Sequence, residues 1–465
     1  MGLDVVPVRN WLGRLPGDAR TRAGAVAAVV VLLLAGVGLV AWSNAAAGRA
    51  ASTYHRERQA LDARLAADAR VGYTDRDLAP ITARLKAMDA TSAPWWIPGR
   101  PGYFDGLASQ TVALRSQLRT LERQVLDRAR SDAAREIQAG RTGIGRDQQV
   151  GADDPDLQAL QQRLDAAAKA DAGARTLRDY RGALQQAQGV VRDANALYDQ
   201  TQQENQQVQL AAQQLLAQTG GNLGAIQQAG QQAITAGRND ASVVAYLNLA
   251  RPFPDDIAVA RAASRLEHFA PLVGSGDANQ AALGTAGVQR YAAQIHQAFV
   301  AGLPAKAVVV SFQAQHLWAY QGGQVVMDTP VTTGVRGVSD IGTDFGPMKV
   351  LFKSHPWTMH SPWPKGSPYW YPDTVVQWAV FFTNTGESIH DAYWEPDSEL
   401  GPGSQYNPST RSHGCIHVPY NDAQWMFNWA EVGMPVIVYP GDGSPVANQL
   451  SQITTDDQGH PKGIP

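Results

Sequence analysis

The segment Ser412-His413-Gly414-Cys415-Ile416-His417 contains the single cysteine of this 465-residue chain. A lone thiol cannot form a disulfide within its own chain, so in an oxidising compartment its more useful role is that of a nucleophile. Histidines flank it at two residues on either side, and His390 lies upstream; imidazoles activate cysteines as general bases. Gly414 indicates a tight turn whose N–H, with that of Cys415, is placed to line an oxyanion hole. The segment predicts a cysteine-based active site rather than a buried, inert thiol.

An uncharged apolar segment of 20 residues, Ala23 to Trp42, lies near the N-terminus. As a helix it would measure about 30 Å, the thickness of the hydrocarbon core of a bilayer. Arginines precede it, which favours a cytoplasmic N-terminus, and it is longer than the apolar part of a typical signal peptide. We expect an uncleaved single-pass anchor, with residues 1–22 as a cytoplasmic tail. The alternative is a signal peptide cleaved near Ala45-Ala46-Ala47.

The composition divides the rest of the chain into two parts. Ala, Gln and Arg dominate residues 50–300, whereas Trp and Tyr concentrate after residue 310. The formal net charge of -3 gives no strong basic field, so nucleic acid is not an expected partner. We expect residues 43–303 to be an extracytoplasmic helical region, residues 304–440 to be a mainly β catalytic domain and residues 441–465 to be a loose tail.

Two apolar seams in the helical region have the alternating spacing of three and four residues that is typical of coiled coils and antiparallel helix pairs. The first seam comprises Leu107, Thr111, Leu114, Leu118, Leu121 and Val125. The second comprises Leu177, Tyr180, Leu184, Ala187, Val191, Ala194, Tyr198, Thr201, Asn205, Val208, Ala212 and Leu215. Breaks are expected at 94–102, at 140–155, at Gly220-Gly221 and, among shorter helices, near 252–254 and 274–276.

The function of the helical region stays open at this point. It is interpreted as a spacer, as a module for partner binding or self-association, or as a solvated bundle without a specific ligand. The pair Trp95-Trp96 in the first break either docks at the membrane surface or packs on the bundle.

After Pro304 the pattern changes from helical to extended. Gly322-Gly323 predicts a hairpin between two strands. The predicted strands are 308–312, 316–320, 324–327, 348–353, 374–382 and 434–439, and a short helix is expected at 421–430. The sequence therefore predicts an α+β multidomain protein with an N-terminal transmembrane helix, a long helical region and a C-terminal mainly β domain.

From roughly Lys306 to Pro440 the chain resembles the L,D-transpeptidases with a YkuD-type catalytic domain. That family has a histidine, a variable loop, and then Ser/Thr-His-Gly-Cys followed by a hydrophobic residue. Ile389-His390-Asp391 and Ser412-His413-Gly414-Cys415-Ile416 supply both parts here.

The resemblance implies a role for each residue of the motif. Cys415 would attack a peptide bond of the peptidoglycan stem, with His390 as the general base and the backbone carbonyl of Asp391 orienting its ring. His413 and Gly414 would shape the oxyanion site, and Ser412 would support the loop. The acyl group would then pass from the thiol to the amine of a second stem and form a 3→3 crosslink, without a metal or other cofactor. Hydrolysis of the same acyl-enzyme, an L,D-carboxypeptidase activity, is the alternative.

Residues around the motif give further candidates for substrate binding. The family often has an aromatic lid in the region of residues 354–371, and such rings exclude water. The candidates are His417, Asp391, Trp357, Trp363, Tyr369 and Trp370. An ordinary aromatic core is the alternative for the rings. Three features depart from the family pattern: His417 stands where Asn or Arg is usual, the loop between His390 and Ser412 is long, and 342–347 only loosely matches a turn common in the family.

Other site classes fit less well. A zinc site has ligand types available at His390, His413, Cys415 and His417, but the chain contains neither HExxH nor a CxxC pair. A sortase cysteine follows a Thr-Leu-x-Thr strand, and an NlpC/P60 cysteine lies at a helix N-terminus with its histidine downstream. A non-catalytic wall-binding protein would not need the Cys–His pair. We expect peptidoglycan stem peptides and the cell membrane as partners, with the catalytic domain on the wall side of the membrane.

Overall fold

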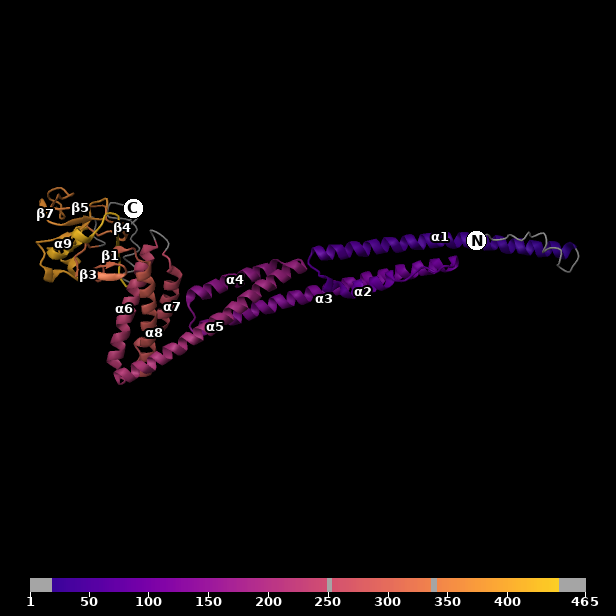
Figure 1. Ribbon diagram of the computed structural model, residues 1–465, viewed down its shortest axis with the longest axis horizontal. Coiled ribbons are helices and arrows are strands. Elements are labelled where there is room, and N and C mark those ends of the chain that lie inside the picture. Colours follow the sequence, from indigo (N-terminus) through magenta and orange to yellow (C-terminus); the bar gives the residue numbers. More distant parts are fainter. Residues whose placement is uncertain (1–18, 249–252, 336–340, 443–465) are drawn as a thin grey trace. The chain divides into compact units, whose positions relative to one another are not determined.

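The computed structural model describes residues 19–248, 253–335 and 341–442 (Figure 1). Most of the two predicted tails, residues 1–18 and 443–465, therefore lies outside the described residues. The fold is α+β, as predicted, with a helical N-terminal part and a strand-rich C-terminal part. The chain divides into two compact units: the first contains described residues 19–142 and 162–192, and the second contains 143–161 and the described residues from 193 onward.

Long helices build the first unit. They are α1 (Ala19–Arg70), α2 (Asp75–Asp89), most of α3 (Arg100–Gln149) and parts of α4 (Asp154–Gly173) and α5 (Leu177–Thr219). Within the described residues, α1 is the one helix long and apolar enough to cross a membrane, and its most apolar window has a mean hydropathy of 2.7 with no buried residue. A core forms where α1, α2 and α3 pack, around Leu61, Ile81, Leu85, Leu114 and Leu118.

The predicted seams lie on α3 and α5. On α3, Leu107, Thr111, Leu114 and Leu118 are buried, and Leu121 and Val125 are half-buried. On α5 the buried seam residues are Leu177, Ala187, Ala194, Thr201, Val208 and Ala212. Helix α5 ends at Thr219, immediately before Gly220-Gly221, as predicted.

Two predicted breaks are shorter than expected. In the first, a 3-10 turn at Ile97–Gly99 leads directly into α3 at Arg100, because a proline in the first helical turn lacks an N–H that would be unpaired there anyway. In the second, α3 continues through Gly140 to Gln149. A Cβ at Gly140 would lie 2.7 Å from Leu164 Cδ1, so glycine permits a close helix–helix approach there, and packing outweighs its cost of about 0.5–1 kcal/mol.

The second unit joins three helices to the strand-rich domain. The helices are α6 (Leu223–Leu247), α7 (Asp256–Val273) and α8 (Ala278–Gly302). Their core is continuous with one face of a five-stranded sheet, because Phe299 and Ile295 share a cluster with Val309, Ile437 and Tyr439. The strand order is β3 (Gln324–Pro330), β2 (His316–Gln321), β1 (Lys306–Ser311), β11 (Pro435–Tyr439) and β4 (Gly346–Lys349).

A second sheet packs on the other face of the first. Its order is β10 (Ile416–Val418), β9 (Ser388–Asp391), β8 (Ala379–Phe381) and β5 (Phe352–Ser354). Alternating residues of β1 point to the two faces: Val309 joins the helix-side core, whereas Val308 and Val310 join Ile389 and Ile416 of the second sheet, together with α9 (Tyr420–Trp429). A further hairpin pairs β6 (Trp357–Met359) with β7 (Thr374–Val376).

The predicted hairpin at Gly322-Gly323 is confirmed by the antiparallel β2–β3 pair, in which both glycines have positive φ. Two other predicted strands are wrong as single elements. Segment 348–353 divides into β4 and β5, and segment 374–382 divides into β7 and β8. In both cases the two halves belong to different sheets. The apolar run is therefore two short strands that lie in different sheets, not one straight strand.

Candidate active site

Cys415 and His390 are brought together by the parallel pairing of β9 with β10. Ile416 pairs with Ile389, and His417 pairs with His390. Because side chains alternate along a strand, Ile389 and Ile416 point into the core, whereas Ser388 and His390 share the opposite face with Cys415 and His417. This face carries the candidate chemistry, although the nucleophile and the histidine are 25 residues apart in sequence.

His390 is oriented by the backbone. The ring is 1% exposed, and its Nδ1 lies 2.9 Å from the carbonyl oxygen of Asp391. A neutral imidazole that donates its proton from Nδ1 leaves a lone pair on Nε2. That Nε2 is buried and has no hydrogen-bonding partner of normal geometry among the described residues. The Cys415 thiol is the group that interacts with this imidazole, so Nε2 is placed to exchange a proton with the sulfur.

The thiol and the imidazole perturb each other. Burial alone would raise the pKa of the Cys415 thiol, but the nearby His390 imidazole and the contacts to Ser388 outweigh burial and hold it below its ordinary value. Burial likewise lowers the pKa of His390, whereas the Cys415 thiolate and the Asp391 carbonyl outweigh this and raise it. The lowered pKa of Cys415 and the raised pKa of His390 both favour a thiolate–imidazolium pair, in which the cysteine is in its reactive form.

Ser388 is a site residue that the sequence analysis missed. Its Oγ lies 3.7 Å from Cys415 Sγ, within range of a weak hydrogen bond to sulfur. Ser388 lies two residues before His390, so a predicted strand over 388–391 would have placed both on one face. The strand has only four residues and no apolar alternation, so this signal was not visible.

The loop before Cys415 is fixed by buried hydrogen bonds. Gly414 has a φ of +125°, which disfavours any residue with a Cβ, and its N–H donates to Ser412 Oγ at 3.1 Å. Thr343 Oγ1 donates to the Gly414 carbonyl at 2.7 Å and accepts from the N–H of Gly334 at 2.8 Å. Ser412 thus supports the loop. The Gly414 amide is already used, so its expected oxyanion role does not fit this geometry.

His417 and Asp391 do not fit their expected roles in substrate binding. His417 is 4% exposed, and its Nδ1 lies 2.7 Å from Glu395 Oε2, while Glu395 Oε1 accepts from Thr332 Oγ1 at 2.6 Å. Burial outweighs the carboxylate and lowers the pKa of His417 to about 4. The Asp391 carboxylate is 2% exposed and accepts from the backbone N–H groups of Gln377 and Trp378. Both side chains brace the sheet.

The expected aromatic lid divides into two groups. Trp363, Tyr369 and Tyr371 surround the His413 ring, with centroids 5.6–6.4 Å away. Burial and then the nearby Cys415 thiolate raise the pKa of Tyr371 to about 12, so its hydroxyl stays neutral, and it donates to the His360 carbonyl at 3.3 Å. Trp357 instead packs on Phe352 and Phe381, and Trp370 lies under the Lys365 ammonium. The structure therefore brings Trp363 and Tyr369, but not Trp357 and Trp370, to His413.

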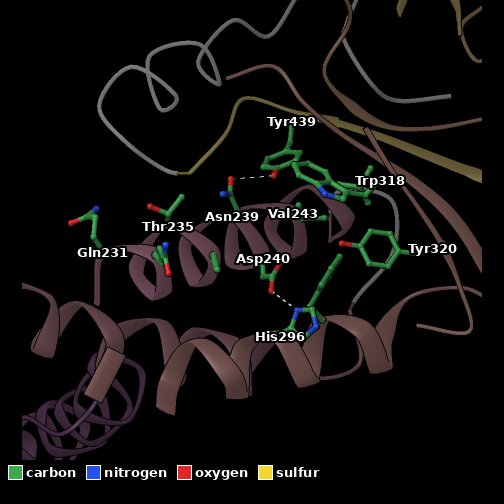
Figure 2. A pocket seen from close by; sticks show the side chains of 13 residues that line it. Gln231, Thr235, Asn239, Asp240, Val243, His296, Trp318, Tyr320 and Tyr439 are labelled. Atoms are coloured by element: carbon green, nitrogen blue, oxygen red, sulfur yellow. Dashed lines mark hydrogen bonds and ion pairs between the residues drawn. The ribbon is translucent and has the colours of Figure 1, made fainter. Parts of the chain in front are cut away.

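A separate pocket of about 530 Å³ lies where α6 and α8 meet the first sheet (Figure 2). Figure 2 shows His296 facing Asp240, with Nδ1 and Oδ2 2.8 Å apart, and the Tyr439 hydroxyl bonded to Asn239 at 3.1 Å. No cysteine, serine or lysine lines it, so it offers no strong nucleophile. Nor does the described part of the chain contain a group of three or more His, Cys, Asp or Glu placed to hold a metal.

Comparison with known proteins agrees with this location of the site. A family model described as the L,D-transpeptidase catalytic domain (YkuD) matches residues 305–438. No curated protein matches the chain. Among solved structures, an Enterococcus faecium L,D-transpeptidase mutant is 28% identical, with 30% of this chain and 50% of that chain covered and a TM-score of 0.26.

An L,D-transpeptidase from Mycobacterium smegmatis is 26% identical, with 29% of this chain and 58% of that chain covered and a TM-score of 0.25. The chain thus spans about half the length of the solved structures it matches first. The family match contains the whole motif from His390 to Cys415. The C-terminal part of the chain, residues 305–438, is therefore an L,D-transpeptidase catalytic domain of the YkuD family.

Proposed function

We propose that this protein is a membrane-anchored L,D-transpeptidase that joins peptidoglycan stem peptides by 3→3 crosslinks through an acyl-enzyme at Cys415. The observation that carries the proposal is the buried His390 imidazole beside the Cys415 thiol: each shifts the pKa of the other toward its charged form, and His390 Nε2 has no other hydrogen-bonding partner among the described residues. The match of residues 305–438 to an L,D-transpeptidase catalytic domain supports the proposal.

In the first half-reaction the Cys415 thiolate attacks the carbonyl carbon of the bond that precedes the terminal D-alanine of a donor tetrapeptide. The C–N bond breaks, the proton on His390 passes to the departing amine, and a thioester remains. The backbone N–H of Cys415 is the candidate donor to the tetrahedral oxyanion. Ser388 Oγ steadies the sulfur.

In the second half-reaction the amine of an acceptor stem attacks the thioester. His390 takes the proton of the amine, the C–S bond breaks and the thiolate returns. The energy of the cleaved peptide bond is retained in the thioester, so no nucleotide is needed. The rings of Trp363, Tyr369 and Tyr371 around His413 restrict water at the cleft, which favours the amine over hydrolysis.

The test is to incubate the protein with disaccharide-tetrapeptide and to identify the products by mass spectrometry. Crosslinked dimer with released D-alanine supports transpeptidation, whereas tripeptide alone would make the enzyme an L,D-carboxypeptidase. Cys415→Ala and His390→Asn should abolish both products. His316→Asn, a matched change on β2 of the other sheet, should leave them unchanged. Unchanged turnover by Cys415→Ala would refute the proposal.

We also propose that α1 holds the catalytic domain at the wall side of the membrane. The support is the exposed apolar stretch of α1, which covers the length of a bilayer core. The protein should stay in the membrane fraction after washing with alkaline carbonate. Release into the wash, with an N-terminus that begins after Ala47, would identify the segment as a cleaved signal peptide instead.

A further inference from the structure

We propose that the loop carrying Trp95 and Trp96, between α2 and α3, is a second membrane contact that inserts into the headgroup region beside α1. This inference rests on the proposed role of α1 as a membrane anchor. It concerns residues of the first unit only and assigns a partner, the lipid surface, to a pair of residues that the catalytic mechanism does not use.

The first observation is the exposure of the two rings. Trp95 is 88% exposed and Trp96 is 50% exposed, so neither is buried in the bundle. A large indole in water is unfavourable by about 25 cal/mol for each Å² of apolar surface. Tryptophan is also the residue most enriched, with tyrosine, at the interface between membrane and water.

The second observation is the position of the loop along α1. The 3-10 turn at Ile97–Gly99 contacts α1. On α1, exposure continues through Trp42, and a buried face then begins at Ser43 and continues at Ala47 and Ala50. Figure 1 shows the same arrangement: the α2–α3 hairpin ends part of the way along α1, and the N-terminal part of α1 runs on without it.

These positions place the loop at the level of the headgroups. Ser43 to Ala50 covers about 10 Å of helix, starting where the apolar segment ends. The polar region of a bilayer leaflet is about 5–8 Å thick outside the hydrocarbon core. We infer that the turn covers this buried face, because it contacts α1 and α1 is exposed up to Trp42. A loop at this level meets the interface when α1 spans the bilayer, whereas a loop near the distal end at Arg70 would not.

The third observation is that the loop is held in shape. Arg100 Nε donates to the Pro94 carbonyl at 3.3 Å, and the Tyr103 hydroxyl donates to the Thr91 carbonyl at 3.1 Å. The Trp96 ring lies over Gly99, where a Cβ would be 2.5 Å from the indole. The loop presents Trp95 without a large cost in conformational entropy on insertion.

The experiment uses the full-length chain with Cys415→Ala, so that one introduced cysteine carries an environment-sensitive fluorophore. Ser92→Cys reports on the loop with both tryptophans intact, Gly36→Cys reports on the middle of the apolar segment, and Ser131→Cys reports on an exposed part of α3 about 45 Å from the loop. Each protein is reconstituted in vesicles of phosphatidylcholine and phosphatidylglycerol that contain lipid with a quencher near the headgroup or near the midplane.

We expect the loop probe to be quenched at least twofold more by the shallow quencher than by the deep one, the Gly36 probe to show the reverse, and the Ser131 probe to be quenched by neither. Adding Trp95→Ser should reduce shallow quenching of the loop probe by half or more, without loss of helix content. A loop probe as unquenched as the Ser131 probe, while the Gly36 probe is quenched, would overturn the inference and point to a protein partner. An unquenched Gly36 probe would instead overturn the anchor.

Discussion

Replacing His390 by asparagine tests whether the imidazole across the strand pair, rather than a histidine adjacent in sequence, activates Cys415. In the structure the His390 ring offsets the effect of burial on the thiol and lowers the pKa of Cys415. Asparagine removes the charge and leaves only the Ser388 contacts to oppose burial, so the pKa of the thiol should rise. His413, although two residues from Cys415, has its own pKa lowered by burial and by Arg411, so at neutral pH it supplies little charge.

The size of the effect follows from the thiolate fraction. A cysteine with the ordinary pKa of about 8.5 is roughly 3% thiolate at pH 7. Lowering the pKa of Cys415 can therefore raise its reactivity at pH 7 by no more than about 30-fold. Loss of His390 should therefore lower the alkylation rate at pH 7 by up to about 30-fold, whereas His413→Asn should change that rate by less than about threefold.

The assay is the rate of alkylation by iodoacetamide between pH 5 and pH 10, followed by intact mass and normalised to the rate at pH 10 to remove differences in access. For the wild-type protein the rate should stay high as the pH falls through 8.5 and drop only at the lowered pKa of Cys415. For His390→Asn the alkylation rate should already fall between pH 10 and pH 8.5, because the pKa of the thiol is higher. The reasoning is refuted if His390→Asn keeps the wild-type profile, or if His413→Asn shifts it as far.

Three further outcomes are expected. Thr343→Val keeps the side-chain volume but removes the hydrogen bonds to Gly334 and Gly414, so urea unfolding should show a loss of about 2–4 kcal/mol, and a loss below 0.5 kcal/mol would contradict the bracing role. The pKa of His417 is about 4 when folded and about 6.5 when unfolded, so the unfolded chain binds the extra proton. Stability should therefore fall by up to about 3 kcal/mol as the pH falls from 6.5 to 4, more in the wild type than in His417→Gln; equal slopes would refute this. A carbapenem should acylate Cys415, because a strained lactam carbonyl meets a thiolate; intact mass should show one adduct that Cys415→Ala lacks, and folded wild-type protein without an adduct would count against the site.

The sequence predicts Cys415 as the nucleophile and His390 as its base, because both residues belong to short sequence motifs. Cys415 is the single thiol, and His390 follows from the family resemblance. The strands that position them cannot be predicted in the same way, since β9 has four residues and β10 has three, too few for a periodic pattern to emerge.

The errors have one physical cause. At 348–353 and 374–382 an apolar run suggested one strand, but the chain changes sheets within it. At Gly140, a residue that usually ends helices lies inside one because a neighbouring helix packs closely against it. The position of His417 in the family motif, where Asn or Arg is usual, suggests a contact with substrate, whereas tertiary structure buries it against Glu395. In each case the local structure depends on contacts between residues far apart in sequence, and a local sequence pattern carries no information about those contacts.

The β9–β10 pairing also explains how two such short strands can hold the candidate active site in one register. In the parallel register His417 lies directly opposite His390, and their rings are 5.0 Å apart. Glu395 and Thr332 hold His417 from the other side, and the backbone of Thr332 exchanges hydrogen bonds with that of His417 at 2.9 and 3.1 Å. A slip of one residue would turn His390 into the core and put a buried isoleucine on the catalytic face. The hydrogen bonds that hold the buried His417 therefore favour the register that sets His390 beside the thiol.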